Sequence, residues 1–165
     1  MLRPQDLLRE YAPLNRKRKQ EGVTLLEYQR WRDLAERLDR EFPERPPLDS
    51  RGPIRVNVAF KTRERLAQAV MLEVRPIGLF VSTPFAPELG TKLTLCVQVE
   101  ETAEEFEADV AVVSSNLGPD FSTANLGMGA RFASPTGPFI DLLDALCLEY
   151  GRAPRKNATR EVEVD

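Results

Sequence analysis

The feature that most constrains the fold is a change in the spacing of apolar residues across a proline-rich segment near residue 50. Before this segment, apolar residues recur every three or four positions, as they do along one face of an α-helix. After it they recur at every second position, as in a half-buried β-strand. The prolines end the helical pattern and favour an extended linker: Pro43, Pro46, Pro47 and Pro53. The chain therefore predicts a helical N-terminal unit joined to a β-rich unit.

Two helices are expected before the linker. The first has apolar residues at helical spacing: Leu7, Leu8, Tyr11 and Leu14. Pro13 interrupts this run and is expected to kink or shorten the helix. The basic run Arg16–Lys19 follows, and it predicts a solvated helix end, with a docking patch as the alternative. Glu21 and Gly22 then predict the turn of a helical hairpin.

The second helix is expected to span about residues 25–42. Thr24 and Glu27 form a Thr-x-x-Glu capping box at its start. One face carries an apolar stripe: Tyr28, Trp31, Leu34, Leu38 and Phe42. Because two helices this short are not stable alone, the stripe must cover the β-rich unit or meet a partner, such as a second copy of the chain.

Six short strands with alternating apolar residues are expected after the linker. They cover residues 55–61, 66–74, 79–82, 92–99, 106–112 and 126–132. The loop Asn116–Asn125 precedes the last strand, and a helix over Phe139–Tyr150 closes the unit. This pattern predicts a mainly β fold, a barrel or a sandwich, with flanking helices.

Four segments follow from these patterns. Residues 1–42 form the helical hairpin, residues 43–54 the proline-rich linker, residues 55–150 the β-rich unit with its closing helix, and residues 151–165 a polar tail.

Composition excludes several classes of function. The chain has no histidine, and its two cysteines match no metal-ligand spacing, so no metal site is expected. It has no nucleophile–base set and no phosphate-binding glycine loop before a helix, so neither a catalytic site nor a cofactor is expected. A net charge of -3 argues against binding of nucleic-acid polymers. Without an apolar run long enough to span a membrane, the chain is expected to be soluble and cytoplasmic.

Two arginines at the start of the β-rich unit are the most informative polar residues. Arg51 and Arg55 stand four positions apart, as Arg-x-x-x-Arg. Two guanidinium groups in this position can hold phosphate oxygens in bidentate fashion or stack on a purine. The alternative is that both are ordinary surface arginines.

The order of the motifs resembles the PilZ family between Arg51 and Tyr150. The arginine pair before the first strand is followed by Gly78 and an apolar strand, then by the glycine-rich strand Gly127–Phe132 and a closing helix. The N-terminal hairpin is similar to an extension on some PilZ paralogues of gliding, predatory bacteria. The resemblance implies a six-stranded antiparallel β-barrel with a C-terminal helix. It also implies a protein without catalytic activity that binds the bacterial messenger cyclic di-GMP.

The second PilZ motif, Asp/Asn-x-Ser-x-x-Gly, falls on residues 73–78, where only the glycine is kept. The candidate ligand-binding residues that the resemblance gives are Arg51, Arg55, Glu73, Arg75 and Gly78. Glu73 keeps a carboxylate on a longer side chain, and Arg75 replaces a small hydroxyl. Arg75 either reaches a ligand phosphate and preserves an altered site, or pairs with Glu73 and fills the guanine position.

Three functions remain open at this stage. The chain is a cyclic di-GMP effector that regulates motility or surface behaviour through protein partners, a messenger-independent interaction adaptor, or a module that dimerises through its hairpin. It is accordingly expected to be a monomer or a homodimer.

Overall fold

The computed structural model describes residues 3–44, 48, 51–72, 74, 77–116, 126–134 and 136–152. These residues form the helices α1 (Pro4–Lys19), α2 (Leu25–Glu41), α3 (Arg63–Ala69) and α4 (Pro138–Glu149). They also form the strands β1 (Arg55–Phe60), β2 (Val70–Met71), β3 (Gly78–Ser82), β4 (Lys92–Val99), β5 (Glu104–Asn116) and β6 (Gly127–Phe132). The predicted loop before β6 and the predicted polar tail lie almost entirely outside the described residues.

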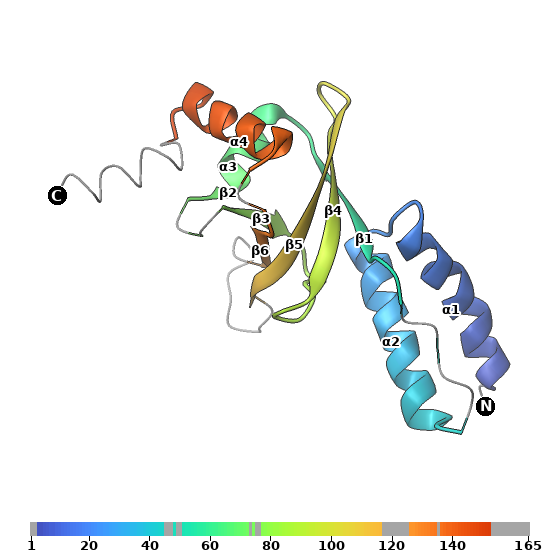
Figure 1. The fold of residues 1–165 in the computed structure, drawn as a ribbon. Helices are drawn as coiled ribbons and strands as arrows, with labels where there is room; N and C mark the ends of the chain where they lie inside the picture. Colours follow the sequence, from blue (N-terminus) through green and yellow to red (C-terminus); the bar gives the residue numbers. More distant parts are fainter. Residues whose placement is uncertain are drawn as a thin grey trace.

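Helices α1 and α2 form the predicted hairpin and lie along each other (Figure 1). The capping box of α2 is confirmed: the Glu27 N–H donates to Thr24 Oγ1 over 3.1 Å, and the Thr24 N–H donates to the Glu27 carboxylate over 2.9 Å. The apolar stripe is buried from Tyr28 to Leu38, with Trp31 at 5% exposure and Leu34 at 0%, and Phe42 at its end is partly buried. The stripe therefore packs within the chain.

The expectation that Pro13 shortens α1 was wrong, and the expectation of a solvated helix end for the basic run was confirmed only in part. Pro13 does not shorten the helix, which continues to Lys19. Pro13 has no N–H to donate to the carbonyl of the preceding turn, and because Pro13 is exposed, water can hydrate that carbonyl instead. The basic run does form the last turn of α1, but Arg18 within it is completely buried rather than solvated.

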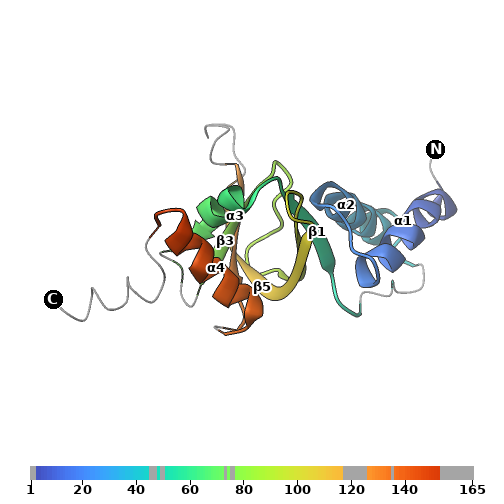
Figure 2. The ribbon, with the colours of Figure 1, turned by 90° about the horizontal axis from the view of Figure 1, so that it is seen from above.

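The six strands form one sheet in the order β1-β4-β5-β6-β3-β2. β1 pairs with β4 in parallel, and the other neighbours pair antiparallel. The prediction of a closed antiparallel barrel was therefore wrong: the sheet is mixed and open, with β1 and β2 at its two edges. Figures 1 and 2 show the α1–α2 hairpin beside β1 and the helices α3 and α4 on the other side of the sheet.

Helix α3 is the reason for this topology. The segment was expected to be part of a strand from residue 66 to residue 74, but among its described residues only Val70 and Met71 are in a strand. Thr62 caps α3 by accepting a hydrogen bond from the Arg65 N–H over 3.1 Å, and the helix sequence RERLAQA consists of good helix formers. The helix carries the chain from β1 to the opposite edge of the sheet, where a tight turn would have placed the two strands side by side.

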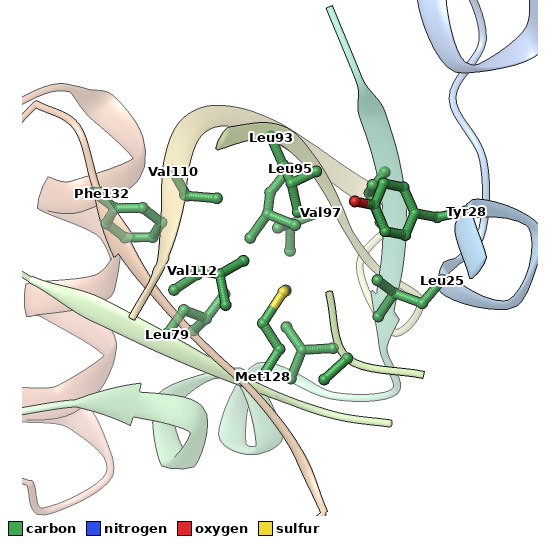
Figure 3. Packing of buried hydrophobic residues seen from close by; sticks show 14 of the residues in the cluster. Leu25, Tyr28, Leu79, Leu93, Leu95, Val97, Val110, Val112, Met128 and Phe132 are labelled. Atoms are coloured by element: carbon green, nitrogen blue, oxygen red, sulfur yellow. The ribbon is translucent and has the colours of Figure 1, made fainter. Parts of the chain in front are cut away.

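One apolar cluster joins the sheet to the helices. The inward side chains of β3 to β6 point toward one another across the curved sheet (Figure 3). Leu25 and Tyr28 of α2 belong to the same cluster, as do Leu66 of α3 and Phe139 of α4. The Phe139 ring stacks on an aromatic ring of β5 with 4.8 Å between centroids. The hairpin, the sheet and the helices α3 and α4 thus share one apolar core.

Helix α4 matches the predicted closing helix, with Pro138 in its first turn. Gly151 follows it with a φ of 80°, which ends the helix as expected. None of the described helices is long and apolar enough to cross a membrane.

Candidate ligand-binding grooves

Arg55, the first residue of β1, is fixed by backbone hydrogen bonds around it. Its carbonyl accepts from the Val23 N–H over 2.8 Å, and the Asn57 N–H donates to the Val23 carbonyl over 2.8 Å. On the opposite edge of β1, the Thr94 N–H donates to the Ile54 carbonyl over 2.8 Å. The turn between α1 and α2 and strand β4 therefore hold the start of β1 between them.

The outer face of the sheet, opposite the apolar cluster, carries a groove of about 560 Å³. Its lining includes the backbone segment Gly52–Ile54 and the polar side chains of Lys92, Thr94, Asp109 and Arg131. Asp109 accepts a hydrogen bond from Thr94 Oγ1 over 2.9 Å. Within the described part of the chain, neither Lys92 nor Arg131 forms an ion pair. We call this the cationic groove, because its two cations face one carboxylate and suit an anionic ligand.

A second groove of about 550 Å³ lies next to the first along β4 and β5. We call it the acidic groove, because Glu21, Glu105 and Glu107 line it together with Arg55 and Cys96. Burial raises the pKa of the Cys96 thiol, so it is protonated at neutral pH and a poor nucleophile.

Arg55 stands where the two grooves meet. It lies opposite Thr94 of the cationic groove in the strand register, while its guanidinium donates to the Glu107 carboxylate of the acidic groove. This hydrogen bond raises the pKa of Arg55. Its Nε atom is buried and finds no hydrogen-bond partner among the residues that the structure describes. Arg55 therefore has one N–H donor, at Nε, that no described residue uses.

The residues directly after Arg51, Gly52–Ile54, form one wall of the cationic groove. The Arg51 side chain is exposed. The carbonyls of Arg51, Gly52 and Pro53 accept hydrogen bonds from the buried Arg18 of α1 over 2.9 to 3.0 Å. Gly52 has a φ of 93°, a conformation that favours glycine.

Gly78 belongs to the same face of the sheet through the strand register. It pairs with Arg131 of β6, which pairs with Ala111 of β5, which pairs with Lys92 of β4. Neighbouring strands are about 4.8 Å apart, so this row places Gly78 about 15 Å from Lys92. A Cβ on Gly78 would lie 2.9 Å from Val74 Cβ, so close packing explains the glycine.

The structure thus places three of the five candidate residues on or beside one face: Arg51, Arg55 and Gly78. Glu73 and Arg75 lie outside the described residues. Lys92 and Arg131 were not among the predicted ligand residues. Strand alternation puts both on the polar side, but only the register shows that they share a groove with the segment after Arg51.

Comparisons of the sequence with protein-family models and with curated proteins found no match. Among the described residues, no group of three or more cysteine, aspartate or glutamate side chains is arranged to hold a metal ion. The chemistry of the two grooves is therefore the basis for a functional proposal.

Proposed function

We propose that this chain is a non-enzymatic signalling protein of PilZ type, which binds cyclic di-GMP in the cationic groove. It would act in the cytoplasm and regulate motility or surface behaviour through protein partners. The observation that carries the proposal is that the segment Gly52–Ile54, between the two arginines, forms a wall of a groove whose other side holds Lys92 and Arg131.

The groove suits a ligand with two negatively charged phosphodiesters. Lys92 and Arg131 supply cations from β4 and β6, and Arg51 and Arg55 flank the wall between them. Guanidinium groups bind phosphate with parallel hydrogen bonds, and they also stack on bases. The resemblance to PilZ domains narrows this chemistry to cyclic di-GMP.

The residues of the groove favour binding over catalysis. The chain has no histidine to act as a general base near neutral pH. Asp109 is the one carboxylate among the described residues that line this groove, so the lining offers no pair of carboxyl groups for acid–base catalysis.

Titration calorimetry with cyclic di-GMP tests the proposal. The wild-type chain is expected to bind one ligand species saturably. Arg51→Ala and Arg55→Ala are each expected to weaken binding about tenfold or more, because each removes charge-assisted hydrogen bonds to phosphate. Arg65→Ala is the matched control, since it removes an exposed arginine of α3 that lines neither groove. No binding by the wild-type chain at high micromolar messenger would end this proposal.

A second candidate is a messenger-independent interaction adaptor. Two observations favour it: Glu107 already occupies the Arg55 guanidinium, and the second PilZ motif is altered at Glu73 and Arg75. The same titration separates the two candidates, because an adaptor would retain its protein partner in a pull-down without binding the messenger.

Dimerisation through the hairpin is less well supported than either. It was motivated by the apolar stripe of α2, and that stripe is buried against the chain's own α1 and sheet.

A further inference from the structure

The least expected side chain of the hairpin is Arg18, in the last turn of α1. It is 0% exposed, although it belongs to a run of four basic residues. Its two terminal nitrogens donate to three consecutive backbone carbonyls, those of Arg51, Gly52 and Pro53. The buried guanidinium therefore binds the back of the segment whose front lines the cationic groove.

Arg18 is itself fixed by its surroundings. Its Nε donates to Asn15 Oδ1 over 2.9 Å, and the Trp31 Nε1–H donates to the same oxygen over 3.1 Å. The Arg18 guanidinium lies 4.8 Å from the centroid of the Trp31 ring. A planar guanidinium held by a ring on one side and by hydrogen bonds at its edges has one orientation available.

This contact fixes the conformation of the groove wall. A hydrogen bond to each of three successive carbonyls sets the direction of three peptide planes, including those that flank the left-handed Gly52. A segment outside any helix or strand loses conformational entropy when a ligand orders it, and this loss weakens binding. Because Arg18 already orders residues 51–53 before a ligand binds, the entropy loss on binding is smaller.

We infer that Arg18 is a positioning residue: it holds residues 51–53 in the conformation that presents Arg51 and Arg55 to an anionic ligand, and Trp31 reports that state. The inference rests on the proposed function only where it concerns cyclic di-GMP. The hold on the backbone is a property of the chain without ligand.

Amide hydrogen exchange tests whether Arg18 holds the backbone of residues 51–53 in the chain without ligand. Arg18→Met keeps the length of the side chain and removes its donors, while Arg18→Lys keeps the charge but offers one nitrogen for three carbonyls. Exchange in a peptide covering residues 51–56 is expected to rise in Arg18→Met and, to a smaller extent, in Arg18→Lys. Arg30→Met is the matched control, because Arg30 pairs with Glu10 across the same two helices.

Two outcomes decide whether Arg18 holds this backbone segment in the absence of ligand. If Arg18→Met does not fold, Arg18→Lys alone is compared with Arg30→Met. Equal exchange over residues 51–56 in the Arg18 variants and in Arg30→Met overturns the inference, whatever the ligand does. A local rise with no binding of cyclic di-GMP by the wild-type chain supports the hold on the backbone and rejects the proposed function.

Calorimetry and fluorescence together test the contribution of Arg18 to the binding of cyclic di-GMP. Trp31 is the chain's single tryptophan, so its emission reports the Arg18 contact directly. In the wild-type chain and in Arg30→Met, cyclic di-GMP is expected to bind without changing this emission, because the Arg18 contact is already formed before the ligand binds. Arg18→Met is expected to alter the emission of the ligand-free chain and to bind about tenfold more weakly. Wild-type affinity in the folded Arg18 variants overturns the inference and leaves the proposed function standing.

Discussion

At the scale of single residues, Arg55 has a partner within the chain that competes with any anionic ligand. Glu107 of β5 accepts a hydrogen bond from its guanidinium and is itself largely exposed. An ion pair with an exposed member contributes little to stability, so it can be exchanged for a phosphate at small cost. Under the proposed function, Glu107 would therefore lower the affinity of the site for its ligand without blocking it.

Replacing this competitor gives the first prediction at this scale. Glu107→Gln is expected to tighten cyclic di-GMP binding about two- to fivefold, which corresponds to the free energy of an exposed ion pair. Glu105→Gln removes the same charge from the same strand and groove, but Glu105 does not pair with Arg55. Calorimetry on both variants separates the two explanations: equal tightening would mean a general charge effect and would contradict a specific role of Glu107.

Some residue-scale features follow from sequence, and others do not. The capping box of α2 is a local pattern, so Thr24 and Glu27 could be predicted to bond each other. The burial of Arg18 could not, because the carbonyls that it binds come from a segment more than thirty residues later in the chain. A run of basic residues is the usual signal of a solvated surface.

At the scale of elements, α2, β4 and β6 lie close to where periodicity placed them. Their patterns are long enough to separate a period of two from a period of 3.6. The segment of α3 carries a short apolar pattern, in which residues 66 and 70 suit either period. The cap at Thr62 and the helix-forming residues of this segment favour a helix over a strand.

Helix α1 offers a test of how much Pro13 costs. Pro13→Ala is expected to raise the free energy of unfolding by about 1–3 kcal/mol, because a proline in a helix interior removes one hydrogen bond and crowds the preceding turn. Pro138→Ala in α4 is the matched control, since the first turn of a helix has no partner for that N–H. Urea denaturation of both variants measures the difference. An equal effect at the two positions would mean that α1 carries no strain from Pro13.

At the scale of the whole molecule, the hairpin and the sheet share one core. Side chains of α2 lie in the same apolar cluster as those of β3 to β6 (Figure 3). The sequence indicated two units joined by a linker, and it could not show that they pack together, because periodicity carries no information on which faces meet. The order of strands in the sheet is non-local for the same reason, and the barrel prediction failed there.

A shared core predicts a single unfolding transition. Leu34→Ala, at a position with 0% exposure in α2, is expected to lower the free energy of unfolding by about 2–5 kcal/mol. Leu26→Ala, on the same helix at 57% exposure, is expected to change it by less than about 0.5 kcal/mol. Trp31 fluorescence reports the hairpin, and amide hydrogen exchange in peptides from β4 and β5 reports the sheet. Two separate transitions, with only the first shifted by Leu34→Ala, would contradict a common core.

The parallel pairing of β1 with β4 also has a consequence for the order in which the chain folds. β4 and β5 are neighbours in sequence, so they can form early as a local hairpin. Within the sheet that the described residues form, β1 pairs only with β4, which lies beyond α3, β2 and β3 along the chain. Closing so long a loop is entropically slow. We therefore expect β1, and with it the arginine pair at its start, to be among the last parts of the molecule to reach the native arrangement.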